Sequence, residues 1–131
     1  MPSSIRAPLV YVIDDDADVL RSLRFLLEAD GFEVRTFRSG EALLNGLAIG
    51  SADCFVIDYR MPHMTGVELA SALRKRKIGA PIILITGSPN RKLLTDAAAA
   101  GISHILPKPH IGESLLTHVR AAIDAERPPS A

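Results

Sequence analysis

Short apolar runs alternate with helix-like segments five times along this chain of 131 residues. The runs occupy residues 9–13, 32–36, 54–57, 81–85 and 102–106, and apolar residues recur at helical spacing after each of them. Strands that alternate with helices in this way form a parallel sheet covered by helices on both faces. The sequence therefore predicts an α/β fold, a doubly wound five-stranded parallel sheet.

The second run differs from the others, and this difference predicts the order of the strands. Phe32, Val34 and Thr36 alternate with polar residues, whereas the runs at 9–13 and 54–57 are apolar throughout. Alternation is typical of a strand at the edge of a sheet, because one of its faces meets water. We therefore expect the order 2-1-3-4-5 rather than the order of dinucleotide-binding domains.

The helices are placed by apolar spacing and by residues that start or stop a helix. The first carries the leucines of residues 19–27 and stops at Asp30-Gly31, and the second follows Ser39 as N-cap and includes Leu47. The remaining three helices are expected near residues 66–77, 90–100 and 115–123.

The length of the chain corresponds to one domain, since domains have roughly 100–200 residues. We assign residues 1–127 to a single domain with its core at about 9–124, and the Pro-rich residues 128–131 to a tail or linker. Lys plus Arg total 15 and Asp plus Glu total 15, so the formal net charge is zero. This balance gives no reason to expect direct contact with nucleic acid or a membrane.

The single cysteine, Cys54, lies in an apolar run and is expected to be a buried small side chain. One cysteine forms no internal disulfide, which fits a reducing compartment. The N-terminal residues lack the apolar stretch of a signal peptide, and no apolar run approaches the roughly 18 residues that span a bilayer. We therefore expect a cytoplasmic location.

Polar residues follow four of the predicted strands at the point where each strand ends. They are Asp14 to Asp16, Asp58, Thr86 and Lys108. The carboxyl ends of parallel strands meet at one edge of the sheet, and ligands of such folds bind there. We expect these side chains to converge on one site.

Carboxylates held this close together repel each other, and a hard divalent cation removes that repulsion. Mg²⁺ binds one or two carboxylates, keeps several waters and leaves positions for phosphate oxygens. The cluster therefore predicts a Mg²⁺ site that receives phosphate. Capping of the first helix is the alternative role for Asp16 and Asp18, and the basic run at residues 74–77 balances the acids elsewhere.

These residues resemble those of a response-regulator receiver domain of two-component systems. The segment Asp58-Tyr-Arg-Met-Pro-His-Met-Thr-Gly66 matches the family pattern D-x-x-M-P-x-M-x-G, and the acids at 14–16, Thr86-Gly87 and Lys108-Pro109 match its other motifs. The resemblance extends from about residue 9 to residue 123, and within the family the sequence is similar to the FixJ-like subgroup. It implies the flavodoxin-like or CheY-like (βα)5 fold.

The resemblance implies a role for each matching residue. Asp58 would be the phosphoacceptor, and Lys108 would bind a phosphoryl oxygen. Asp15, Asp58 and the backbone carbonyl of Arg60 would hold Mg²⁺, and Asp14 would assist directly or through water. The domain would catalyse its own phosphorylation and slow dephosphorylation, without being an enzyme in the usual sense.

The resemblance also implies partners and a switch. A sensor histidine kinase or a histidine phosphotransfer protein would supply the phosphoryl group. Thr86 would move toward the phosphorylated carboxylate, and the surface of the fourth helix, fifth strand and fifth helix would meet a downstream protein or a second copy of the chain. The family carries an aromatic residue three positions before the lysine, where this chain has Ile105. The adjacent His104 is expected to face solvent or a partner, and the Lys108-Pro109 bond is expected to be cis.

Two alternatives remain open from the sequence. In a haloacid-dehalogenase-like phosphatase, Asp14 and Asp16 would form the catalytic pair, with Thr86 and Lys108 beside them. In a phosphorylation-independent adaptor or dimerisation module, the fold would be kept and the chemistry lost, which Ile105 makes conceivable.

Overall fold

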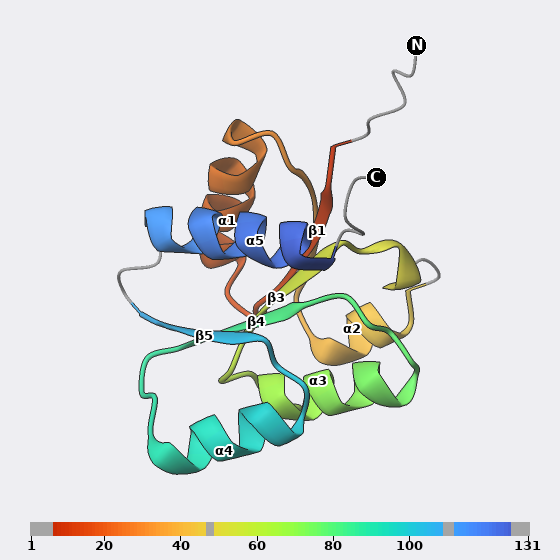
Figure 1. The fold of residues 1–131 in the computed structure, drawn as a ribbon, viewed down its shortest axis with the longest axis vertical. Helices are drawn as coiled ribbons and strands as arrows, with labels where there is room; N and C mark the ends of the chain where they lie inside the picture. The colour runs from red at the N-terminus through yellow and green to blue at the C-terminus, as the bar shows by residue number, and fades with distance from the viewer. Residues whose placement is uncertain (1–6, 47–48, 109–111, 127–131) are drawn as a thin grey trace.

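The computed structural model describes residues 7–46, 49–108 and 112–126 of the chain. Its strands form one parallel sheet in the order β2-β1-β3-β4-β5 (Figure 1). The strands are β1 (Leu9–Ile13), β2 (Glu33–Phe37), β3 (Cys54–Asp58), β4 (Ile82–Thr86) and β5 (His104–Pro107). This architecture confirms the doubly wound α/β fold and the strand order expected from the sequence.

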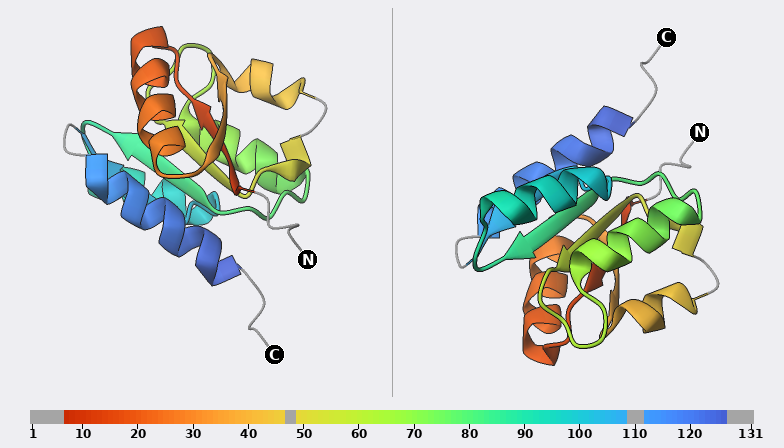
Figure 2. Two further views of the ribbon diagram at one scale, coloured as in Figure 1. Left: turned by 90° about the horizontal axis from the view of Figure 1, so that it is seen from above. Right: turned by 90° about the horizontal axis from the view of Figure 1, so that it is seen from below.

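Helices cover both faces of the sheet (Figures 1 and 2). They are α1 (Ala17–Ala29), α2 (Gly40–Leu44), α3 (Gly66–Lys75), α4 (Arg91–Ala99) and α5 (Gly112–Glu126). α1 and α5 lie on one face, and α2, α3 and α4 lie on the other. A short 3-10 helix, η1 (Ile49–Ser51), precedes β3 and is not among the predicted elements. No helix among the described residues is both long and apolar enough to cross a lipid bilayer.

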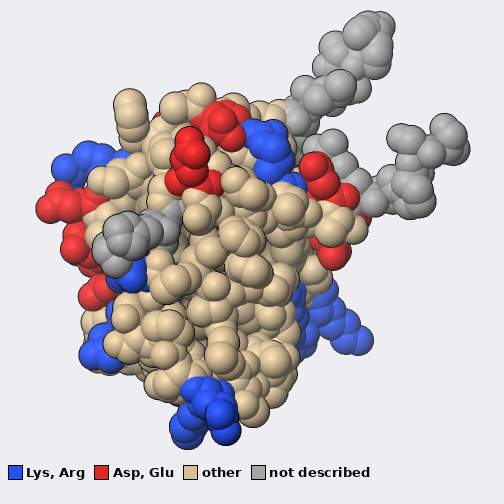
Figure 3. Space-filling model, turned by 60° about the vertical axis from the view of Figure 1, so that its left-hand side comes forward, with Lys and Arg blue, Asp and Glu red and all other residues tan. Residues whose placement is uncertain are grey.

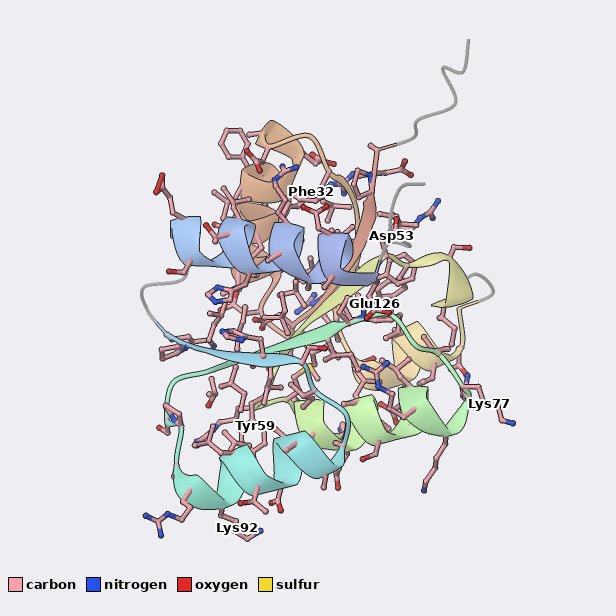
Figure 4. All side chains as sticks on the ribbon, viewed as in Figure 1. Phe32, Asp53, Tyr59, Lys77, Lys92 and Glu126 are labelled. Carbon is pink, nitrogen blue, oxygen red and sulfur yellow. The ribbon has the colours of Figure 1, made fainter. Side chains whose placement is uncertain are left out.

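Alternate residues of the central strands enter two separate apolar cores. In β1, Tyr11 and Ile13 pack toward α3 and α4, whereas Val10 and Val12 pack toward α1 and α5. The same alternation in β3 and β4 explains why these strands are apolar throughout. Figure 4 shows Phe32 between α1 and α5, and the guanidinium of Arg120 lies 4.8 Å from the centre of its ring.

Cys54 lies in the core under α1 and α5 and is fully buried, as the sequence predicts. Burial, with a smaller contribution from the charge of Asp53, raises the pKa of its thiol to about 12. A thiol with this pKa stays protonated near neutral pH, and the thiolate is the nucleophilic form. Cys54 is therefore a packing residue.

Polar side chains cap the first turns of α1 to α4 and explain where these helices begin. The caps are Asp16, Ser39, Thr65 and Asn90. At α3 the cap is reciprocal, because the Glu68 side chain accepts from the N–H of Thr65 while the Thr65 side chain accepts from the N–H of Glu68. The predicted caps Asp16 and Ser39 are thereby confirmed.

Some element boundaries differ from the predicted ones. α3 ends at Lys75 rather than at residue 77, because the chain enters the left-handed region at Lys77, where φ is 62°. β5 begins at His104, although the N–H of Ser103 already donates to β4. α2 ends at Leu44, and the expected helix residue Leu47, the Lys108-Pro109 bond and the tail at 128–131 involve residues outside those described.

Two arginines of the basic run at 74–77 bind backbone carbonyls. Arg74 donates to the carbonyl oxygens of Ile78, Ala80 and Gly101. Arg76 donates to the carbonyl of Leu44 at 2.8 Å. These side chains therefore join α3 to the loops around it, in addition to balancing the acids at the far edge of the sheet.

Gly66, the first residue of α3, lets this helix approach the sheet closely. A Cβ at this position would lie 2.6 Å from Leu84 Cδ1 and 2.7 Å from the carbonyl oxygen of Asp58. The N–H of Gly66 also donates to the carbonyl of Tyr59 at 2.9 Å. Gly66 thereby fixes the end of β3, where Asp58 lies, against the start of α3.

We expect Gly66→Ala to lower the free energy of unfolding by about 1–3 kcal/mol, because the added methyl group meets backbone that has no room to move. Urea denaturation measures this loss. The matched control is Gly112→Ala, since a Cβ at Gly112 meets nothing within 4 Å. A loss in Gly66→Ala no larger than in the control would contradict the close approach.

Candidate functional site

The carboxyl ends of four strands bring the predicted polar residues to one edge of the sheet. Asp14 follows β1, Asp58 ends β3, Thr86 ends β4 and Lys108 follows β5. This edge includes the point between β1 and β3 where the chain reverses its direction of winding. The structure therefore brings together side chains that are up to 94 residues apart, from 14 to 108.

Asp14, Asp15 and Asp58 form a cluster in which one carboxylate oxygen from each lies within 4.8 Å of the others. Asp14 and Asp58 are buried, with 4% and 5% of their surfaces exposed. Burial, together with the charge of Asp58, raises the pKa of Asp14 to about 6, although a hydrogen bond from the N–H of Asp16 acts to lower it. The ionised form of Asp14 is thus destabilised without a counter-charge.

Asp16 stands apart from this cluster. Its carboxylate accepts hydrogen bonds from the N–H groups of Asp18 and Val19 at the start of α1. Asp16 is therefore a helix cap, which was one of its two predicted roles. The phosphatase alternative needs Asp14 and Asp16 as a catalytic pair, and the structure gives Asp16 this other role.

Lys108 and Asp58 form an ion pair, with 2.7 Å between Lys108 Nζ and Asp58 Oδ1. The Lys108 N–H donates to the carbonyl of Thr86 at 2.8 Å, which holds the residue beside the end of β4. Partial burial acts to lower the pKa of Lys108, but the hydrogen bond and charge of Asp58, with Asp14 and Asp15, raise it above its usual value. Lys108 is therefore a fixed cation within the site.

A pocket of about 240 Å³ opens beside this ion pair. It is lined by Asp58, Arg60, Thr86, Gly87, Ser88 and Lys108. The hydroxyl of Thr86 accepts a hydrogen bond from the N–H of Ser88 at 3.2 Å. Five of these residues belong to the motifs that the sequence pointed to. Ser88 lies outside those motifs, although its position two residues after Thr86 in the same loop was a usable signal.

The end of β2 shapes the acidic loop after β1. The N–H of Asp14 donates to the carbonyl of Phe37, and the Arg38 guanidinium donates to the carbonyl of Asp15, each at 3.1 Å. Arg38 therefore holds the backbone that presents Asp14 and Asp15. No motif in the sequence pointed to this contact, because it joins residues 23 positions apart.

Ile105 lies three residues before Lys108, at the position where the family that the sequence resembles carries an aromatic residue. Its half-buried side chain packs against the core on the α3 and α4 side of the sheet. His104 is exposed, as expected, and its ring also stacks on that of His118 in α5, with the ring centroids 3.9 Å apart. Successive strand residues point to opposite faces, so the His104 ring lies on the α5 side.

Charge is distributed unevenly over the surface even though the net charge is zero. On the face drawn in Figure 3, acidic and basic side chains lie beside each other at the left-hand edge and along the top, basic ones also lie at the lower edge, and a broad area at the centre is uncharged. The charged side chains on this face therefore lie around its rim rather than at its centre.

The donors of the acidic cluster fit a hard divalent cation. All of them are carboxylate oxygens, which are the ligands that Mg²⁺ and Ca²⁺ prefer. Burial raises the pKa of Asp14, so a positive charge beside it would stabilise its ionised form. The cluster can therefore hold a metal ion.

We expect Asp14→Asn to stabilise the metal-free domain by about 1–3 kcal/mol at about pH 7.5, because it removes a buried charge whose pKa is raised on folding. The wild-type chain takes up a proton at Asp14 as the pH falls through about 6, so its stability rises toward that of the variant. Urea denaturation in a chelating buffer at about pH 7.5 and about pH 5 measures both effects. A variant less stable than the wild type at the higher pH would contradict this reading, and Asp124→Asn serves as the surface control.

Comparison with known proteins shows which protein family this chain matches. The model of the response regulator receiver domain matches residues 10–120. The transcriptional regulatory protein FixJ of Bradyrhizobium diazoefficiens is 36% identical over 119 residues, which cover 91% of this chain and 58% of FixJ. The response regulator protein TodT of Pseudomonas putida is 34% identical over 120 residues, which cover 92% of this chain and 53% of TodT.

The fold agrees with this match. The crystal structure of FixJ-N has a TM-score of 0.80 and 30% identity, over 96% of this chain and 100% of FixJ-N. The chain spans a little over half the length of the two curated relatives. The family model extends from β1 into α5 and includes every strand of the sheet. The chain belongs to the response regulator receiver domain family.

Proposed function

We propose that this receiver domain accepts a phosphoryl group on Asp58 from a phosphohistidine and passes the signal on through protein contacts. The observation that carries this proposal is the placement of the Asp58 carboxylate. It is buried at the end of β3, lines the 240 Å³ pocket and lies 2.7 Å from the ammonium of Lys108. A carboxylate so placed borders the pocket and already has a cation beside it.

In the transfer, one carboxylate oxygen of Asp58 attacks the phosphorus, and the phosphorus–nitrogen bond of the phosphohistidine breaks. The imidazole leaves with the electron pair of that bond and takes up a proton from water, and an aspartyl phosphate remains. Such transfers depend on positioning and on neutralising charge at the phosphoryl oxygens. Lys108 supplies a positive charge at the pocket, and its raised pKa keeps its side chain protonated.

Asp14, Asp15 and Asp58, with the backbone carbonyl of Arg60, would hold Mg²⁺. The fit rests on the clustered carboxylates and on the cost of ionising Asp14 without a cation. Bound Mg²⁺ supplies positive charge that offsets the carboxylates and the phosphoryl oxygens. Asp14 assists as a direct ligand or through a water molecule.

Thr86 is the residue that responds to the new phosphoryl group. The group brings a charge of about −1.5 to −2 into the pocket, if it titrates like other phosphorylated side chains. The Thr86 hydroxyl accepts its hydrogen bond from Ser88, so its own hydrogen is left to donate to a phosphoryl oxygen. Ile105 stands where the family has an aromatic residue, and its side chain has no ring that could turn when Thr86 moves. The loop at residues 87–90 therefore transmits the movement of Thr86 to α4.

The partners follow from these roles. A sensor histidine kinase or a histidine phosphotransfer protein donates the phosphoryl group, and the aspartyl phosphate is slowly hydrolysed. The surface of α4, β5 and α5 meets a downstream protein or a second copy of the chain. We expect no direct contact of this domain with nucleic acid or with a membrane, because its net charge is zero.

We expect Asp58→Asn to reduce acid-labile labelling by a phosphodonor, in the presence of Mg²⁺, to background. An amide nitrogen or oxygen does not replace the carboxylate nucleophile. Labelling is measured by incorporation of radioactive phosphate. Asp124→Asn on α5 changes an exposed carboxylate outside the pocket and should label like the wild type. Full labelling of Asp58→Asn would show that another residue accepts the phosphoryl group.

We expect a beryllofluoride phosphate mimic with Mg²⁺ to shift the backbone amide resonances of residues 87–90, because Thr86 draws this loop inward. Two-dimensional NMR measures the shifts, and Asp58→Asn is the control that should show none. Unchanged spectra of the wild-type domain would favour the adaptor module, which does not respond to phosphate.

A further inference from the structure

The rings of His104 and His118 form a stacked pair between β5 and α5. Their centroids lie 3.9 Å apart and their planes differ by 25°. His104 begins β5, the edge strand, and His118 lies in the middle of α5. The pair therefore joins the last strand of the sheet to the last helix.

We infer that this stacked histidine pair is a proton-sensitive contact, which holds α5 against β5 near neutral pH and weakens on acidification. Two neutral rings stack favourably, and one protonated ring on a neutral ring is a cation–π contact. Two protonated rings at this separation repel each other. The inference does not depend on Asp58, because it concerns packing at a different part of the fold.

One hydrogen bond of His118 indicates which of its two ring nitrogens binds a second proton. Its Nδ1 lies 2.7 Å from the carbonyl oxygen of Ser114, which only accepts, so Nδ1 carries a hydrogen and donates. The Nε2 atom therefore takes the additional proton when the ring becomes charged. The hydrogen bond to Ser114 is kept when the His118 ring becomes charged. The repulsion between the two charged rings therefore weakens the stack with His104.

Among the described residues, the neighbours of the pair on β4 and along α5 offer no carboxylate to offset a second positive charge. On β4, the register partner of His104 is Ile83, and β4 itself contains no charged residue. The α5 residues three and four positions from His118 are also uncharged; they are Ser114, Leu115, Ala121 and Ala122.

Several charged groups of the surrounding elements are held in ion pairs. On α5, Arg120 pairs with Asp30, and on α4, Lys92 pairs with Asp96. Lys108, after β5, pairs with Asp58. The other charged residues of these two helices are Arg91, Glu113, Asp124 and Glu126. Among the described residues, His118 is the one group whose charge acts on the pKa of His104.

Burial of one ring face, and then the charge of His118, lowers the pKa of His104 below its usual 6.5. A histidine whose pKa falls on folding contributes stability above its unfolded pKa and loses it as the pH falls through the folded pKa. Acidification below about pH 6.5 therefore weakens the contact between β5 and α5. β5 also carries Ile105 and leads to Lys108, so the effect reaches the proposed output surface.

A histidine titration by NMR tests the coupling between the two rings. We expect the His104 midpoint to lie below 6.5 in the wild-type domain. In His118→Gln it should rise by about half a pH unit or more, because the second charge is gone. His63→Asn, in the loop after β3, removes a histidine outside the pair, and asparagine tolerates its φ of 70°. An unchanged His104 midpoint in His118→Gln would overturn the coupling.

Amide hydrogen exchange at about pH 7.5 and about pH 5.5, corrected for intrinsic rates, tests the effect on packing. We expect protection in β5 and α5 to fall at least about threefold more than protection in β1 at the lower pH. His118→Phe keeps an aromatic stack in which His104 alone can be charged, so two like charges never meet and this difference should be abolished. Asp14 titrates in both the wild type and His118→Phe, so the difference between the two proteins reports the effect of the histidine pair alone. An equal loss in His118→Phe, or no loss in the wild type, would contradict the inference.

Discussion

The repulsion among the carboxylates of Asp14, Asp15 and Asp58 is the constraint on which the rest of this domain depends. Two of these side chains are buried, and a single lysine, Lys108, pairs with the cluster through Asp58. A fold that needed only stability would not gather these acids, since each unpaired buried charge costs several kcal/mol in principle. The cluster is instead suited to a cation and to a ligand that carries phosphate.

The scaffold around the cluster is rigid where the chemistry needs fixed positions. β1 and β3 are buried on both faces and end at Asp14 and Asp58, while the close approach of Gly66 fixes the turn after β3. The opposite wall of the pocket is a loop, in which Thr86 binds the backbone of Ser88. In the function proposed for this domain, the strands hold the acids in place, and the loop after Thr86 moves when the charge at Asp58 changes.

The sheet order and the convergence of Asp14, Asp58, Thr86 and Lys108 were predictable because both follow from where apolar strands end. Contacts between distant side chains were not predictable in this way. No periodicity or motif shows that Arg38 holds the carbonyl of Asp15. The stack of His104 on His118 also depends on the angle of α5 across the sheet, which a single sequence does not reveal.

The central claim is that Asp58, rather than Asp14 or Asp15, carries the phosphoryl group. Borohydride reduces an aspartyl phosphate to homoserine and leaves free carboxylates unchanged, so it marks the modified residue. Tandem mass spectrometry of the phosphorylated and reduced domain then reads its position. We expect homoserine at position 58 and aspartate at positions 14 and 15. Homoserine at either of those positions, or none in a fully labelled domain, would contradict the assignment.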